Sequence, residues 1–281
     1  MVSKQKLGQS AIKRQRISMM WTIIIITLSA VAIFPIISIL ELTIYNGIKA
    51  LTPHFVASPL LAAEREAFAT AFIGTAIMMT LATIITLPIS ILVGILCVEH
   101  PNHWIVRMCR LSVDILQGAP AIVIGIIVYC WMVFPTRQFS GLAGTLALVI
   151  IMMPVSIRST EEVLKKIPRS LIESALALGV PNYRAIQKVM IPTAFRGILS
   201  GTCIAASRAS GETAPLLLTA FGTPFIAVSL LKEMGALPLM IYHYSASHND
   251  IWQAMAWGGA LALITVNVIL ISASHWIGHE K

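Results

Sequence analysis

The chain has 281 residues, of which 57% are hydrophobic and 11% are charged, whereas about 25% of an average soluble domain is charged. This composition excludes an ordinary cytosolic globular protein, because a chain of this length cannot hide so much apolar surface from water. The formal net charge of +8 suggests nucleic acid as a partner unless the basic residues follow membrane topology instead. The class indicated is an all-α, polytopic membrane protein.

Six stretches are long and apolar enough for a spanning helix, which needs about 20 mostly apolar residues. They are residues 19–40, 68–98, 115–134, 142–157, 197–218 and 252–277. The first stretch is longer than the apolar run of a signal peptide, about 7 to 15 residues. We therefore interpret it as a retained membrane anchor. The four cysteines occur singly, so no metal site or disulfide framework is predicted.

Residues 225–244 are also fairly apolar, but Lys232, Glu233, Gly235 and Pro238 interrupt them. Central charges are costly in a spanning helix, so an outer-face or re-entrant element is favoured over a seventh span. With the N-terminus and C-terminus in the cytoplasm, fifteen of the 20 Lys and Arg residues fall in inner segments and four in outer ones. This asymmetry follows the positive-inside rule, and it accounts for the net charge without nucleic acid.

The connection between the fourth and fifth predicted spans, residues 158–196, is the most informative one. Apolar residues at helical spacing from Ser170 to Leu178, followed by Gly179, predict a short helix ended by a glycine turn. The pattern restarts after Pro181 and ends at Pro192, so two short helices are expected. The residues alone allow a solvated amphipathic hairpin or a segment with a function of its own, as is usual for so long a connection.

The segment from Glu173 to Pro192 resembles the EAA loop of ABC-importer permeases, whose pattern is EAA, three residues, Gly, nine residues and I-x-L-P. The chain departs from this pattern at Ser174, Val189 and Ile191, which are similar in size to the family residues. The resemblance implies that the segment docks in a groove of an ATP-hydrolysing subunit and transmits its closure to the membrane helices. The implied coupling residues are Glu173, Ser174, Ala175, Gly179, Ile191 and Pro192.

The fifth predicted span contains Arg208 and Glu212. Ionisable residues are costly in a membrane and normally face a bundle interior or a water-filled path. Four positions apart on a helix, the two side chains share a face and can pair. Pro215 removes a backbone donor, which predicts a polar break in this span. Since a guanidinium can bind a tetrahedral oxyanion bidentately, the pattern indicates either an anion path or a buried structural pair.

The stretch RASGETAP, with PVSIRSTEE and VDILQGAPAIVIGIIVY before it, resembles the PstA-type permease family of bacterial phosphate importers. The resemblance runs from about residue 68 to the last helix and implies a type I ABC importer permease (MetI-like) fold with six transmembrane helices. The implied organisation is a basic cytoplasmic segment 1–18, a first helix with its outer connection 19–67, and a permease domain 68–281 that contains the coupling loop 158–196.

In that family the intramembrane Arg and Glu are associated with phosphate passage, which maps onto Arg208 and Glu212, with Thr213 adjacent. Arg158 and Asp114 are the further pathway positions that the resemblance implies. From position alone, Arg158 equally fits a snorkelling arginine at the end of a span. Asp114 equally fits a carboxylate that complements a helix dipole.

The sequence contains no GxxxxGK[ST] phosphate loop, nucleophile elbow or HExxH motif, so no catalysis by this chain is predicted. The resemblance implies a permease subunit of an ATP-driven phosphate importer in the bacterial inner membrane. The implied partners are a homologous PstC-type permease subunit, a PstB-type ATPase dimer that uses ATP and Mg, and an external PstS-type phosphate-binding protein. The alternatives are a permease for sulfate, molybdate or phosphonate, and a membrane enzyme or ion-coupled carrier that needs no ATPase.

Overall fold

The computed structural model describes residues 2–51, 62–223 and 229–279, which are helical without a β-strand apart from one isolated bridge between Phe221 and Met234. The all-α prediction is confirmed. The long helices are α1 (Val2–Ala50), α3 (Ala62–Glu99), α7 (Gly141–Lys165), α10 (Ile191–Ser210) and α13 (Asp250–His279). The shorter helices are α4 (Trp104–Gly118), α5 (Ala121–Val128), α6 (Phe134–Thr136), α8 (Arg169–Ala177), α9 (Asn182–Ala185), α11 (Ala214–Thr219) and α12 (Leu237–Ser245).

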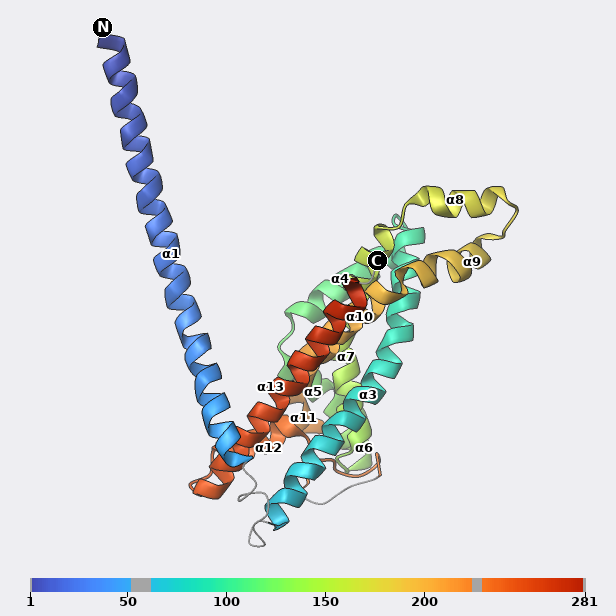
Figure 1. Ribbon diagram of the computed structural model, residues 1–281. Coiled ribbons are helices and arrows are strands. Elements are labelled where there is room, and N and C mark those ends of the chain that lie inside the picture. Colours follow the sequence, from blue (N-terminus) through green and yellow to red (C-terminus); the bar gives the residue numbers. More distant parts are fainter. Residues whose placement is uncertain (1, 52–61, 224–228, 280–281) are drawn as a thin grey trace.

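Helix α7 forms the centre of the bundle and packs against α3 and α10 (Figure 1). Its buried side chains Leu148 and Met152 belong to the main apolar core with Met78 of α3. Helix α10 approaches α7 closely because position 201 is a glycine; a Cβ on Gly201 would overlap the side chain of Ser159. The bundle therefore holds α10 at van der Waals distance along the central helix.

Helix α1 leans away from the bundle and joins it only near one end (Figure 1). There a Cβ on Gly47 would overlap Leu261 of α13, so the two helices touch closely. Most of the apolar side chains along the preceding turns, such as Trp21, Phe34 and Ile39, are exposed in the single chain. In a membrane this surface faces lipid or another chain, as expected for the predicted anchor.

Within the part of the chain that the structure describes, five helices are long and apolar enough to cross a membrane, namely Ser18–Ala50, Glu66–Glu99, Gly141–Lys165, Asn182–Ser210 and Asp250–Gly278. In the same part of the chain, a sixth crossing is offered by the bent pair Trp104–Gly118 and Ala121–Thr136, whose axes meet at 109°. The prediction of one straight span over residues 115–134 is therefore wrong. Ala119 precedes Pro120 and is extended, with φ −72° and ψ 133°, because a residue before proline is driven out of the helical region.

The fifth predicted span, residues 197–218, is also corrected. The helix starts at Asn182, stops at Ser210, and is followed by the separate short helix α11. The polar break that Pro215 predicted is confirmed at residues 211–213.

Pro192 does not end the second hairpin helix, because a π-turn at Ile186–Met190 leads directly into α10. The wider turn removes the clash that a proline ring makes with the carbonyl four residues earlier.

The two ends of the helix bundle differ in structure. Helices α8 and α9 form a hairpin that projects beyond the bundle at the end where the chain's C-terminus lies, which we name the hairpin end (Figure 1). Between the long helices at this end lie only residues 166–181. The predicted loop 158–196 was therefore too long, because residues 158–165 belong to α7 and residues 182–196 belong to the helical segment that continues into α10. At the opposite end, Lys232 and Glu233 lie in a turn and only Leu237–Ser245 is helical. A span over residues 225–244 is thus excluded by residues 229–236, while 224–228 lie outside the described residues.

Candidate functional site

Two helix breaks meet at one small cavity, where α4, α5, α7 and α10 come together. The cavity has a volume of about 70 Å³. The break between α4 and α5 contributes Ala119 and Ala121, and the break between α10 and α11 contributes Glu212. The breaks lie side by side because α5 packs on α11, where a Cβ on Gly125 would lie 2.7 Å from the Cα atom of Pro215. The remaining lining residues include Arg208, Gln117, Ile124, Ile151 and Pro154.

Arg208 and Glu212 both line this cavity, but they do not form the ion pair that their spacing allows. Arg208 lies in the last turn of α10, whereas Glu212 lies beyond the helix end, with its backbone N–H donating to the carbonyl of Ala209. Because the helix stops at Ser210, the four-residue spacing no longer places both side chains on one helical face. The guanidinium of Arg208 is exposed in the single chain and remains available to a ligand.

The N-terminal end of α5 adds a second source of positive potential. Ala121 and Ile124 from its first turn line the cavity, and no side chain caps this end. The first backbone N–H groups of a helix have no partner within the helix, and they favour an anion. Together with Arg208, this end gives the cavity a positive field, which Glu212 opposes from the other break.

Gln117 is a lining residue that sequence reasoning missed. Its side-chain amide donates to the carbonyl of Pro154 in α7, at 3.4 Å. Gln117 lies in the last turn of α4, directly before the Gly118 to Pro120 break. The signal was present in the sequence as LQGAP, because a polar residue before a glycine and a proline marks a helix end inside an apolar stretch.

The other predicted pathway residues lie near the cavity without lining it. Asp114 is in α4, one turn before Gln117, and Arg158 is in α7, one turn after Pro154. Both residues are exposed in the single chain. Thr213 lies in the α10 to α11 break next to Glu212 and precedes the first residue of α11. The structure therefore brings Arg208 and Glu212 together at the cavity and leaves the other three beside it.

A buried ion cluster, also missed from the sequence, fixes α4 close to this site. The carboxylate of Glu161 has 3% of its side chain exposed, and one oxygen accepts from Arg110 at 2.8 Å and from Lys165 at 2.7 Å. Arg110 also donates to the backbone carbonyl of Cys97 in α3, at 3.0 Å. The cluster therefore joins α3, α4 and α7 at the hairpin end, through a carboxylate that two cations neutralise.

The hairpin helix α8 presents an uncovered apolar surface. Leu178 is 84% exposed, and Leu171 and Leu176 are also exposed. Glu173 and Ser174 are exposed, and Ala175 is half-buried. Gly179 ends the helix at φ +80° with no atom within 4 Å of a Cβ, so the predicted glycine turn is confirmed. Ile191 and Pro192, the other predicted coupling residues, lie in the first turn of α10 rather than in the hairpin.

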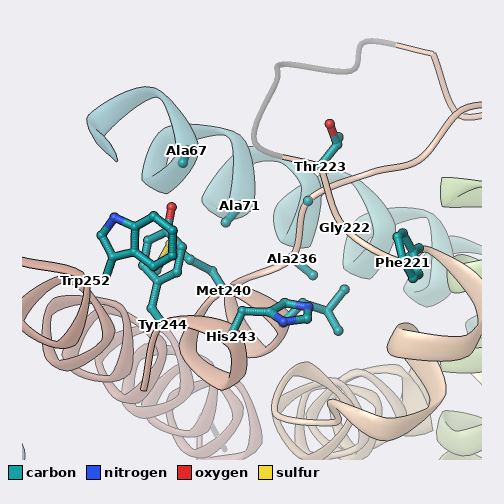
Figure 2. Close-up of a pocket in the computed structure, with 12 residues that line it drawn as sticks. Ala67, Ala71, Phe221, Gly222, Thr223, Ala236, Met240, His243, Tyr244 and Trp252 are labelled. Carbon is teal, nitrogen blue, oxygen red and sulfur yellow. The ribbon is translucent and has the colours of Figure 1, made fainter. Parts of the chain in front are cut away.

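A larger cavity, about 370 Å³, lies elsewhere, at the end that holds α12. Figure 2 shows it between α3, α12 and α13, with Tyr244 and Trp252 at one side. Those two rings stack with centroids 5.0 Å apart. Among the residues that the structure describes, its lining is mostly apolar and contains no Lys, Arg, Asp or Glu. This cavity therefore lacks the charges that an inorganic anion requires, and the smaller cavity at Arg208 is the candidate site.

The fold of this chain occurs in membrane subunits of ABC transporters. The family described as binding-protein-dependent transport system inner membrane component matches residues 87–279. A methionine ABC transporter chain in an inward-facing conformation has a TM-score of 0.58 at 16% identity, with 79% of this chain and 99% of that chain covered. An amino acid ABC transporter chain has a TM-score of 0.52 at 14% identity, with 77% and 96% covered. These structures show the fold alone.

Sequence relatives are more specific. A Xylella fastidiosa protein named phosphate transport system permease protein PstA is 41% identical over 74% of this chain and 73% of its own length. The protein of that name from Pasteurella multocida is 36% identical, with 89% and 91% covered. A probable PstA from Methanocaldococcus jannaschii is 33% identical, with 92% and 93% covered. The chain belongs to the inner membrane components of binding-protein-dependent transport systems and, within them, to the PstA family.

Proposed function

We propose that this chain is the permease subunit of an ATP-driven importer that carries inorganic phosphate across the inner membrane into the cytoplasm. Its relatives in the PstA family carry phosphate transport in their names. The observation that carries the proposal is Arg208 at a cavity formed by two helix breaks. Backbone that leaves the helix inside a membrane is tolerated where protein or water satisfies it, as along a transport path.

The size and the charge of the cavity support a small anion. About 70 Å³ is well below the roughly 300 to 1,000 Å³ of pockets for larger organic ligands. The permanent charge of Arg208 and the uncapped N–H groups of α5 attract an oxyanion, and Gln117 can donate a further hydrogen bond. Glu212 limits the net positive charge, so that the anion is held weakly enough to leave. Asp114, Arg158 and Thr213 stay predicted pathway residues beside it.

The exposed side of this site requires a partner. Arg208 and Gln117 are both exposed in the single chain, whereas an anion path must be enclosed from lipid. A homologous permease subunit of the PstC type would close this side. A binding protein of the PstS type would deliver phosphate from outside.

The hairpin end is the proposed site of coupling to an ATPase dimer of the PstB type, which would use the ATP and Mg. The uncovered leucines of α8 fit a hydrophobic groove, and Glu173 can meet a basic partner. Closure of the ATPase pair would push on α8, and α10 would carry that motion to Arg208. Alternating access of the cavity to the two sides follows from this movement.

The orientation that we propose places both termini and the hairpin in the cytoplasm. Figure 1 places the N-terminus, the C-terminus and α8 towards the same end of the molecule. The basic residues of that end, including Lys165, Lys166 and Arg169, then lie inside, in agreement with the positive-inside rule.

The function is tested by phosphate uptake in cells that lack this chain but keep its partner subunits. Re-expression of the chain should restore uptake that requires the ATPase subunit and that excess sulfate, molybdate or phosphonate does not inhibit. Stronger transport of one of those anions would overturn phosphate as the substrate. Uptake that persists without the ATPase and collapses with an ionophore would overturn the importer class.

A further inference from the structure

Asn267 of α13 connects to the helix end that carries Arg208. Its side-chain oxygen lies 3.1 Å from the hydroxyl of Ser207 and 2.7 Å from the hydroxyl of Ser210. These two serines stand on either side of Arg208 in the last turn of α10. One amide oxygen of a neighbouring helix therefore lies within hydrogen-bond distance of both hydroxyls of the turn that precedes the break.

This turn needs an external support because its own hydrogen-bond pattern stops there. The last carbonyl groups of a helix have no partner further along the helix, and such ends fray. The hydroxyl of Ser210 also lies 2.8 Å from the carbonyl of Ser207, so its single proton is shared between that carbonyl and the side-chain oxygen of Asn267. The chain then leaves the helix at Gly211, and the backbone N–H groups of Gly211 and Glu212 donate back to the carbonyls of Arg208 and Ala209, at 3.4 and 3.1 Å. The link to α13 adds a restraint from outside the helix.

The Asn267 link and the cavity at Arg208 lie on different faces of α10. Ser207 and Ser210 are three positions apart, so they share the face of α10 that meets α13. Arg208 is one position on from Ser207 and lies on a different face, where it lines the cavity with residues of α4 and α7. Asn267 does not line that cavity. Its effect on a transported ion must pass through the orientation of Arg208.

We propose that Asn267 is a positioning residue, which holds the last turn of α10 so that the Arg208 guanidinium faces the anion path. The inference rests on the proposed function of that path. A polar side chain inside a membrane bundle finds a partner on a neighbouring helix, and here the partner is the broken end of α10. Loss of the link should turn the guanidinium away while the two helices stay packed.

A second polar link between the same helices provides a matched control. Ser200 of α10 and Ser274 of α13 have their hydroxyls 2.8 Å apart, and the Ser274 hydroxyl lies 3.1 Å from the Ser200 carbonyl. Each residue lies seven positions, or about two turns, from its counterpart in the Asn267 link. The control therefore breaks an α10 to α13 hydrogen bond without touching the turn of Arg208.

The experiment measures phosphate imported per ATP hydrolysed by the full transporter in proteoliposomes with saturated binding protein. Asn267→Leu should lower this ratio by about threefold to tenfold, the range of one interhelical hydrogen bond in a membrane. The half-saturating phosphate concentration should not change, and ATP hydrolysis should continue. Ser274→Ala should leave the ratio at the wild-type value, because Arg208 keeps its support.

A second variant covers the case in which Asn267→Leu does not assemble. The double substitution Ser207→Ala with Ser210→Ala removes both donors with little change of volume, and it should reproduce the lowered ratio. Ser207→Thr with Ser210→Thr keeps the hydroxyls and should restore the ratio. An unchanged ratio in the double alanine variant, or an equal loss in Ser274→Ala, would overturn the positioning role. Failure of the wild-type protein to import phosphate would instead overturn the proposed function itself.

Discussion

Proline residues have different effects on the helices at the two breaks that line the cavity and on the continuous helices around them. Pro135 and Pro192 each follow a π-turn; the helix ends one residue after Pro135, at Thr136, but continues from Pro192 to Ser210. Pro120 and Pro215, by contrast, follow positions where the helix has ended. The difference lies in what precedes the proline, since a glycine stands two residues before Pro120 and four residues before Pro215.

Proline alone therefore does not open a helix in this molecule. Pro35, Pro88 and Pro154 lie inside continuous helices, and at Pro192 the wider π-turn accommodates the proline ring without a break. Glycine adds the conformational freedom to leave the helix, and Glu212 and Gln117 bring polar groups to the gap. The two breaks that line the cavity at Arg208 each combine glycine, proline and a polar residue.

The largest expected loss comes from removing the carboxylate that holds α4 in place. Glu161→Leu leaves Arg110 without its ion pair, and an uncompensated charge of this kind typically costs about 3 to 5 kcal/mol. We expect little assembled transporter in membranes and a lower unfolding temperature in detergent. The double variant Glu161→Leu with Arg110→Met removes both charges and should recover much of the stability. If the single variant were as stable as the wild type, the cluster would not hold α4.

The second largest effect should follow from closing one break. Pro120→Ala restores a backbone donor and removes the restriction on Ala119, so α4 and α5 should approach a continuous helix. Displacement of Gln117 and the α5 end by even about 1 Å could cost up to about a hundredfold in rate. Phosphate uptake at equal membrane level is the measurement.

The matched control for that experiment is Pro192→Ala. The helix already continues through Pro192, so relaxing the π-turn should change uptake little. Equal losses in both variants would contradict the distinction between the two kinds of proline. Wild-type uptake in Pro120→Ala would show that the bend is not required.

The smallest effect on stability should come from the hairpin turn, although coupling should suffer there. Gly179 has φ +80°, and a side chain in that conformation costs about 1 to 2 kcal/mol. Gly179→Val should therefore reduce the stimulation of ATP hydrolysis by loaded binding protein. Gly179→Asn should retain most of it, because asparagine tolerates the left-handed region. Unchanged stimulation in the valine variant would count against docking through this turn.

Local patterns predicted much of the fold, because long apolar runs and turn residues act within a few positions. The all-α class, the glycine turn at Gly179 and the break before Pro215 followed from such patterns. The bend at Pro120 was missed, because residues 115–134 are apolar enough to look like one span. Hydropathy measures the free energy of placing side chains in the membrane, and it contains no information on the direction of the backbone.

The site depended on contacts that sequence spacing cannot supply. Arg208 and Glu212 stood out because charges are rare inside a span. The ion pair that their spacing allowed does not form, because the helix ends between them at Ser210. Gln117 and Asn267 are uncharged, so they do not stand out in an apolar stretch as Arg208 and Glu212 do. The packing of α4, α10 and α13 places them near the turn of Arg208.

The central claim is that the guanidinium of Arg208 contacts the transported anion, and Arg208→Lys tests it most directly. The substitution keeps the charge but removes the planar, bidentate donors. We predict that phosphate uptake is lost while the membrane level and ATPase stimulation remain. Arg107→Lys makes the same change at an exposed position of α4 and should transport as the wild type does. Uptake at the wild-type rate with Arg208→Lys would contradict the account and reduce Arg208 to a point charge.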